Sequence, residues 1–240
     1  MFMLRNHIQS IVEAAVQSVD PARLVRRRVS VVGREILLDG APLAEPIRLS
    51  DRGRIVVVGG GKAAAGMARG LADVFDHGGL RVAGLVSVQE GCARHVAGIE
   101  TRETRPATEN VPTAAAVRAT REMLGMMGSL GADDVVVALI SGGGSALLAA
   151  PRDGVPLEEK VGIARFLAAR GAPITEINTV RQAASDVKGG RLARECSAGR
   201  MLVLVLSDVI GDPLDAIASG PCMPVEVDAN QALDVLERYG

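Results

Sequence analysis

A chain of 240 residues is long enough for one large α/β domain or two small ones, and a hydrophobic content of 48% provides a sizeable core. Aromatic residues make up only 2% of the chain, so we expect this core to be aliphatic. The 27 basic and 28 acidic residues nearly cancel, and a net charge of −1 gives no reason to expect a nucleic acid or an anionic membrane as partner.

The cysteines and the N-terminus indicate the compartment. The chain has three cysteines, which lack both the paired spacing of metal ligands and the density of a disulfide framework, and this favours a reducing environment. Polar residues follow the first few apolar ones, so no signal peptide is predicted. No run of about 18 apolar residues predicts a membrane span. We therefore expect a cytoplasmic protein.

The first fifty residues predict two helices and a hairpin. Apolar residues recur at helical spacing over residues 8–19, which predicts an amphipathic helix, and Asp20-Pro21 is a typical start of a second helix. Two short apolar runs over residues 29–38, separated by Gly33-Arg34, predict a β-hairpin. We expect residues 42–53, which contain two prolines, to connect this hairpin to the main sheet.

A buried strand, a glycine turn and a lysine come next. Ile55–Val58 is a β-branched apolar run typical of a buried parallel strand, and Gly59-Gly60-Gly61-Lys62 follows it directly. A helix of small residues begins at Ala63, and a second apolar run, Val82–Val88, comes at βαβ spacing. A lysine at a helix start is a natural partner for phosphate, and an ordinary surface lysine is the alternative interpretation.

A second glycine loop follows the apolar run Val135–Ile140. The loop reads Ser141-Gly142-Gly143-Gly144-Ser145, and a helix could begin at Ala146. Glycines allow a sharp turn and a close approach to a ligand because they carry no Cβ. A strand, a glycine turn and a helix start together favour an anion cradle for phosphate or carboxylate. The alternative is a tight turn whose glycines serve packing alone.

Charged residues then cluster after a helix predicted to begin at Pro156. Glu176, Asn178, Arg181 and Lys188 place an acid, an amide and two cations within thirteen residues. Charged groups at helical spacing are usually just exposed. Here glycines interrupt them and apolar segments flank them, which favours a binding site.

The most apolar run of the chain, Met201–Leu206, predicts another buried strand. It leads into Ser207-Asp208, and Asp212 follows shortly after. Carboxylates just beyond the carboxyl end of a parallel strand lie where open α/β sheets bind ligands. Asp208 and Asp212 could hold Mg²⁺ while substrate phosphates supply the remaining oxygens. Asp208 as the cap of the next turn is the alternative.

The spacing of these apolar runs predicts the fold. Runs near residues 55, 82, 135 and 202, separated by helical segments, indicate an α/β class with a Rossmann-like, doubly wound, mainly parallel sheet and helices on both faces. The two glycine loops and Ser207-Asp208 then lie at the same edge of the sheet.

In this combination the sequence resembles the N-terminal domain of the glycerate 2-kinase family. The resemblance runs over nearly the whole chain, residues 1–240, as a single Rossmann-like domain. Full-length members of that family carry a second, C-terminal MOFRL domain, which has no counterpart here. The resemblance is strongest in Gly60–Ala63, Ser141–Leu147, Glu176–Arg181, Lys188–Ala193 and Ser207–Pro221.

The resemblance implies ATP-dependent phosphorylation of glycerate at its 2-hydroxyl, with Mg²⁺, in a cleft between two domains. It makes Lys62 the cation on the transferring phosphoryl group and Asp208 a metal ligand or base. The glycine loops would hold the nucleotide phosphates, and Arg181 and Lys188 would neutralise the substrate carboxylate or phosphate. A MOFRL-domain chain is the partner that the resemblance implies.

One departure from the family pattern concerns the substrate. The family usually reads Gly-His-Pro before a Val-Pro or Leu-Pro pair, where this chain has Thr108-Glu109-Asn110-Val111-Pro112. A carboxylate in place of an imidazole puts a like charge near an anionic substrate.

Two other functions stay open at this point. A non-catalytic module for nucleotide or phosphate is one, because half a cleft can bind without turnover. A hydroxypyruvate reductase is the other, since members of the family have carried that name. The glycine pattern is not G-x-G-x-x-G, and no acid follows the second strand to hold a ribose, which argues against a reductase.

Overall fold

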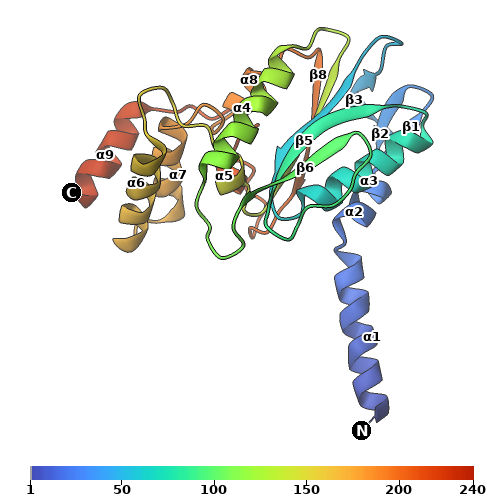
Figure 1. Cartoon of the computed structure of the whole chain (residues 1–240), viewed down its shortest axis with the longest axis horizontal. Helices are drawn as coiled ribbons and strands as arrows, with labels where there is room; N and C mark the ends of the chain where they lie inside the picture. Colours follow the sequence, from blue (N-terminus) through green and yellow to red (C-terminus); the bar gives the residue numbers. More distant parts are fainter. Residues whose placement is uncertain (1) are drawn as a thin grey trace.

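The centre of the molecule is a five-stranded, entirely parallel sheet (Figure 1). The computed structural model describes residues 2–240. The strands lie in the order β6-β5-β4-β7-β8, which is 3-2-1-4-5 along the chain, the Rossmann order. The predicted α/β class is thereby confirmed. The five strands are β4 (Ile55–Gly60), β5 (Val82–Gln89), β6 (Ile99–Arg105), β7 (Val135–Ser141) and β8 (Arg200–Leu206).

Helices make up about half of the remaining chain, and the predicted ones form. Three of them start after capping residues: the side chains of Asp20, as predicted, and of Thr113 and Asp228 each accept a hydrogen bond from the backbone of the first turn. The helices are α1 (Phe2–Ser18), α2 (Pro21–Arg28), α3 (Ala64–His77), α4 (Ala114–Gly128), α5 (Gly144–Leu147), α6 (Leu157–Ala169), α7 (Ile174–Ala183), α8 (Arg191–Arg194) and α9 (Ala229–Tyr239), with a short 3₁₀ turn η1 (Ile217–Ser219).

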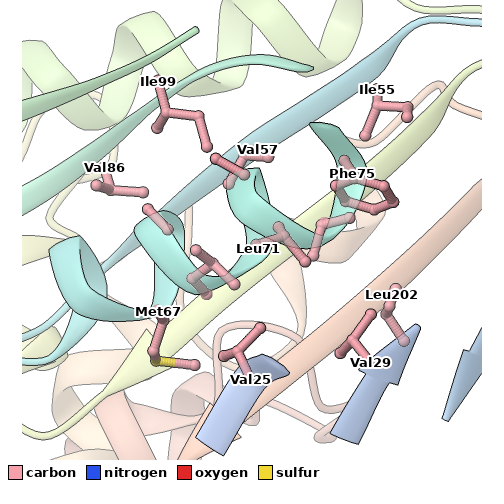
Figure 2. Packing of buried hydrophobic residues seen from close by; sticks show 14 of the residues in the cluster. Val25, Val29, Ile55, Val57, Met67, Leu71, Phe75, Val86, Ile99 and Leu202 are labelled. Atoms are coloured by element: carbon pink, nitrogen blue, oxygen red, sulfur yellow. The ribbon is translucent and has the colours of Figure 1, made fainter. Parts of the chain in front are cut away.

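Alternate residues of the central strands face opposite helical layers. Val57 of β4 packs with Phe75 of α3 on one face, as Figure 2 shows. The next residue, Val58, packs with Met123 of α4 on the other face. Because both faces are covered, β4 and β7 are buried along their whole length, which explains their unbroken apolar sequences.

A small antiparallel sheet precedes the main one. Its strands β1 (Val29–Val32) and β2 (Glu35–Leu38) are the predicted hairpin. Residues 41–48 were expected to be a connection, and that expectation was wrong: they form a third strand, β3 (Ala41–Arg48), paired with β2. Prolines are compatible with a strand when it lies at the edge of its sheet, as β3 does.

The first helix forms as predicted but its apolar face is uncovered. Ile8, Ile11, Val12 and Val16 are all more than half exposed. Figure 1 shows α1 extending away from the rest of the molecule. Neither α1 nor any other helix within residues 2–240 combines the length and hydropathy needed to cross a membrane.

The strand β8 lies at the edge of the main sheet, although its sequence predicted a buried strand. It pairs with β7, and most of its residues are only half-buried. An apolar sequence by itself does not distinguish an edge strand from a central one, and here it was misleading.

A separate helical cluster lies beside the sheet (Figure 1). Helices α6, α7 and α9 share a small core of their own. Its buried residues are Leu167, Ala172, Ile177, Val180, Ala232 and Val235. This cluster places α6 and α7 opposite the loops that follow β7 and β8.

An ion pair between a buried carboxylate and an exposed arginine joins the starts of the two central strands. Asp134, just before β7, is 6% exposed and accepts hydrogen bonds from the backbone N–H of Arg54 at 2.7 Å, from Arg54 Nη2 at 2.6 Å and from the N–H of Gly131 at 2.9 Å. The Arg54 guanidinium holds the pKa of this carboxyl well below its usual range.

We expect Asp134→Asn to lower the melting temperature by several degrees at pH 7, because it removes the charge that Arg54 pairs with. A carboxyl whose pKa is depressed by folding contributes stability above its unfolded pKa of about 4, and that contribution is lost as the pH falls below this value. The wild type should therefore lose more stability than the variant between about pH 5 and pH 3. Melting curves across this range test the difference, with Asp73→Asn, an exposed ion-pair partner of Arg26, as control. Parallel curves for wild type and Asp134→Asn would contradict the assignment.

Candidate active site

The candidate site lies at the carboxyl edge of the sheet, between β4 and β7. These two strands are neighbours in the sheet. The next strand after β4, which is β5, lies on one side of the pair, and the next strand after β7, which is β8, lies on the other side. Ligands of open α/β sheets bind where the strand order reverses in this way. The loops after β4, β7 and β8 meet there, as the sequence predicted.

Two hydrogen bonds join the first two loops. The backbone N–H of Lys62 donates to the carbonyl oxygen of Gly142 at 2.9 Å, and that of Ala63 donates to Ser141 Oγ at 3.1 Å. Gly61, the residue before Lys62, has a φ of +146°, and a Cβ on it would lie 2.1 Å from Ser141 Oγ. Only glycine permits this approach, so the glycines of the first turn bring the two loops together.

Asp208 brings a carboxylate against the second loop. A Cβ on Gly142 would lie 2.1 Å from Asp208 Oδ2, so the missing side chain of Gly142 leaves room for this carboxylate. Asp212, predicted as a second ligand of Mg²⁺, is exposed on the following turn, away from the cavity described below. Within residues 2–240, no three His, Cys, Asp or Glu side chains cluster as a metal site. Mg²⁺ at Asp208 would therefore need oxygen ligands from a bound molecule, as it commonly does beside phosphates.

The helix that follows the second glycine loop is shorter than expected. It comprises only Gly144–Leu147, a single turn, and the chain leaves it at Leu148. One turn of helix aligns few peptide dipoles. The positive charge at this loop therefore comes mainly from side chains.

Two cationic side chains flank Gly143. A Cβ at this position would lie 3.5 Å from Lys62 Cγ and 3.8 Å from Arg105 Nη2. Lys62 is exposed, and its ammonium makes no hydrogen bond or ion pair with the part of the chain that the structure describes. The predicted cation is thus free to bind a ligand at the glycine loop.

Arg105, at the end of β6, was missed by the sequence analysis. It is 4% exposed and donates to three neutral groups: Asn110 Oδ1 at 3.0 Å, Gln89 Oε1 at 2.8 Å and the carbonyl oxygen of Glu109. Its Nε has no hydrogen-bond partner among the described residues, and burial lowers its pKa. A buried cation without a carboxylate nearby favours an anionic ligand. The alternating charges of residues 100–105 resemble an exposed edge strand and gave no signal for this role.

A cavity of about 360 Å³ opens between the loops and helices α6 and α7. Its lining combines one carboxylate, that of Asp208, with four cations: Lys160, Arg165, Arg181 and Lys188. Of the predicted site residues, those lining it are Gly142, Gly143, Ser145, Asn178, Arg181, Lys188 and Asp208.

A chain of side-chain hydrogen bonds connects α7 to the second glycine loop. Ser219 Oγ donates to Asn178 Oδ1 at 3.0 Å and lies 3.0 Å from Ser145 Oγ. Ser219 itself has a left-handed backbone with a φ of +64°, as has Ala218 with +53°. Strained residues of this kind persist where the surroundings hold them, and they are common at functional sites. Asn178 and Ser145 are therefore fixed by their mutual contact with Ser219.

Lys188 is held inside the protein. It is 1% exposed, and its Nζ donates to the carbonyl oxygens of Ser145 at 2.9 Å, Leu148 at 3.3 Å and Ala218 at 3.3 Å. Burial lowers its pKa well below the ordinary value. This side chain therefore fixes the second glycine loop to η1, a role that differs from the predicted neutralisation of substrate.

Arg181 and Glu176 lie on different sides of α7. Arg181 lines the cavity, burial lowers its pKa, and its guanidinium makes no hydrogen bond or ion pair with residues 2–240. Glu176 lies outside the cavity, where its carboxylate pairs with Arg238 of α9. The structure thus supports a ligand contact for Arg181, whereas Glu176 contacts the C-terminal helix.

Lys160 of α6 is a further cavity residue that the sequence analysis missed. It is 6% exposed, and its Nζ donates to the carbonyl oxygen of Ala184 at 2.9 Å. Burial is the main cause that lowers its pKa to about 7. Because Lys160 follows two glutamates in a helical segment, its sequence context resembles an exposed helix face.

The loop that departs from the family pattern forms part of the cavity wall. Asn110 lines the cavity, and the Glu109 carboxylate lies 3.8 Å from Arg165 Nη2 of α6. Both partners of this pair are exposed. The like charge expected near an anionic substrate is therefore partly balanced by Arg165.

Comparison with known proteins gives consistent matches over the chain. The family described as "Domain of unknown function (DUF4147)" matches residues 7–240. The chain is 37% identical to the glycerate kinase of Rattus norvegicus, over 99% of this chain and 46% of that protein. It is 38% identical to the D-glycerate 2-kinase of Thermotoga maritima, over 92% of this chain and 52% of that protein. A relative from Agrobacterium vitis, 41% identical over 78% of this chain and 47% of that protein, is named putative hydroxypyruvate reductase.

A solved structure matches the fold as well. The PH0495 protein of Pyrococcus horikoshii OT3 superposes with a TM-score of 0.84 at 34% identity, covering 98% of this chain and 51% of that one. The chain thus spans about half the length of the relatives it matches.

Proposed function

Because this chain belongs to the DUF4147 family, we propose that it forms one half of a glycerate 2-kinase, which transfers a phosphoryl group from ATP to the 2-hydroxyl of glycerate. Relatives named glycerate kinase and D-glycerate 2-kinase support the reaction. Each of them is about twice as long as this chain, so the second half of the cleft is expected from a MOFRL-type domain or partner chain.

The observation that carries the proposal is the meeting of three strand-end loops beside one cavity: the loops after β7 and β8 line it, and the loop after β4 is hydrogen-bonded to the first of these. Lys62 lies free beside Gly143, Asp208 lies against Gly142, and Arg181 faces the cavity without a protein partner. A cavity that combines one carboxylate with unpaired cations suits a phosphorylated nucleotide and an anionic acceptor. Phosphoryl transfer depends on positioning and charge neutralisation more than on covalent chemistry.

The residues present fit ATP and Mg²⁺. The free Lys62 and the buried, carboxylate-free Arg105 suit nucleotide phosphates at the loops Gly59–Gly61 and Ser141–Ser145. Asp208 would hold Mg²⁺ together with phosphate oxygens. When bound, ATP supplies the phosphoryl group, and Mg²⁺ neutralises part of the negative charge on its phosphates.

The chain's own side chains then orient the acceptor. Arg181 binds the carboxylate of the acceptor. Asn178 lines the same cavity, where its hydrogen bond with Ser219 holds it in place. Asp208 is the candidate that accepts the proton of the 2-hydroxyl, if it does not ligate the metal. The free thiols of all three cysteines suit a reducing, cytoplasmic location.

A reductase is a weaker candidate for this geometry. In dinucleotide folds an acid near the end of the second strand holds the ribose. Here β5 ends in Gln89, whose side chain accepts a hydrogen bond from Arg105.

A coupled ADP-release assay with D-glycerate tests the proposal. We expect little turnover from this chain alone, because transfer needs a closed and water-poor cleft. Addition of a MOFRL-type domain in trans should restore turnover, and Asp208→Asn should then reduce it by about 100-fold or more. Asp212→Asn is the matched control, expected to have the smaller effect.

Two outcomes would contradict this function. Oxidation of NADH with hydroxypyruvate, without ATP, would favour the reductase. Binding of MgATP with no transfer to D-glycerate, even with the partner domain supplied, would favour a non-catalytic binding module.

A further inference from the structure

Lysine is rare in this chain and is confined to the candidate site. Of the 27 basic residues only three are lysines: Lys62, Lys160 and Lys188. Lys62 lies at the glycine loops, and the other two line the cavity. Arginine serves at every other basic position. A buried lysine can lose its proton whereas arginine stays charged, so these three positions differ chemically from every other basic position of the chain.

Two of the three lysines have evident tasks, and Lys160 does not. Lys62 is the free cation at the glycine loops, and Lys188 holds three carbonyl oxygens. Lys160 donates only to the carbonyl oxygen of Ala184. An ammonium group has three donors, so two of them have no protein partner among the described residues.

The charges around Lys160 favour an anion. The cations that face it are Arg181 of α7, Lys188 and Arg191, and the single carboxylate is that of Asp186. Asp186 is itself near Arg152, at 3.8 Å, and is partly exposed. Positive charge is therefore in excess at this end of the cavity, where burial makes an uncompensated charge costly.

We propose that Lys160 binds the carboxylate of the hydroxy-acid substrate, together with Arg181, at the α6–α7 end of the cavity. The proposal rests on the function proposed above and adds a residue that sets its specificity for an acid. The reacting hydroxyl then lies toward Asp208 and Gly142, on the wall formed by the strand-end loops.

Proton uptake follows from this assignment. The Lys160 amine has a pKa of about 7 in the free protein, and a bound carboxylate raises that pKa by favouring the charged form. Below pH 7 the amine is already protonated, so the affinity for the acid should not depend on pH. Above pH 7 each bound acid must be accompanied by one proton from solvent, and the affinity should fall by up to about tenfold per pH unit.

The small number of lysines makes a direct test practical. Lysine labelled with ¹³C at Cε gives three NMR signals, which Lys62→Met and Lys160→Met assign. We expect the Lys160 signal to titrate near pH 7 and its midpoint to rise by about one unit or more with saturating D-glycerate. MgATP, added separately, should shift the Lys62 signal. An equal response of Lys160 to sodium acetate at the same ionic strength would contradict recognition of a hydroxy acid.

Calorimetric titration with D-glycerate distinguishes the roles of the side chain. Lys160→Met should weaken binding by about tenfold or more, whereas Lys160→Arg should retain binding and lose its pH dependence above pH 7. Arg170→Met is the control, because Arg170 lies exposed on the same segment and stacks on Phe166 outside the cavity. Circular dichroism verifies that each variant is folded.

The outcomes separate this inference from the function it rests on. If D-glycerate and MgATP both bind but Lys160→Met binds the acid as tightly as wild type, only the role of Lys160 is wrong. If MgATP shifts Lys62 and D-glycerate does not bind, the assignment of the acid to this cavity is overturned. If neither ligand binds, the kinase function fails as well.

Discussion

Lys188→Ala is expected to lower the free energy of unfolding by roughly 3–5 kcal/mol, the largest effect on stability that we predict. The substitution removes a fully buried stem and leaves a cavity. It also removes the donor for the carbonyl oxygens of Ser145, Leu148 and Ala218, which come from two distant segments. Buried acceptors without a donor are costly, so packing and hydrogen bonding change stability in the same direction. Urea denaturation followed by circular dichroism measures the loss.

Two further variants make this result interpretable. Lys188→Met keeps most of the stem volume and so separates the effect of packing from that of the carbonyl contacts. Arg194→Ala, an exposed cation on the neighbouring helix α8, should change the free energy of unfolding by less than about 0.5 kcal/mol. If Lys188→Ala also changed the free energy of unfolding by less than about 0.5 kcal/mol, Lys188 would not hold the loops together.

Lys62→Met is expected to abolish most of the stabilisation that MgATP confers. A ligand at 100 times its dissociation constant stabilises the folded state by about 2.7 kcal/mol. For a chain of this size that corresponds to a rise in melting temperature of about 5 °C or more. Because Lys62 is exposed and makes no contact with a protein acid, its loss should weaken the nucleotide without destabilising the free protein.

Thermal melts with and without MgATP check this expectation. Arg69→Met, an exposed substitution on α3, should leave the shift as it is in the wild type. A full shift in Lys62→Met would mean that Lys62 is an ordinary surface residue and that Arg105 or the loop amides carry the phosphate contact.

The parts of the fold that sequence could predict are those set by local composition. Strands β4 and β7 are continuous apolar runs because both their faces are covered, and the glycines after them reflect contacts that leave no room for a Cβ. Parallel strands bring such loops to one edge of the sheet. The meeting of Lys62, Ser141 and Asp208 was therefore predictable without coordinates.

The parts that could not be predicted depend on long-range packing. Strand β3 forms despite its prolines because β2 offers it an edge, and the position of β8 at the sheet edge is a property of the whole topology. Lys160 and Arg105 stand in highly charged sequence contexts, and only the tertiary structure buries them. Glu176, by contrast, forms an ion pair with Arg238 of α9. These two residues are far apart in the sequence, so no local pattern indicates the contact.

The outer edge of β8 has a consequence for the handling of the protein. Among residues 2–240, no strand pairs with that side of β8, although its sequence from Met201 to Leu206 is entirely apolar. An apolar edge with unpaired backbone groups is a template for strands of other molecules, and charged or proline residues usually guard against this. Only Arg200, at the beginning of β8, provides such protection. The isolated chain should accordingly self-associate at high concentration.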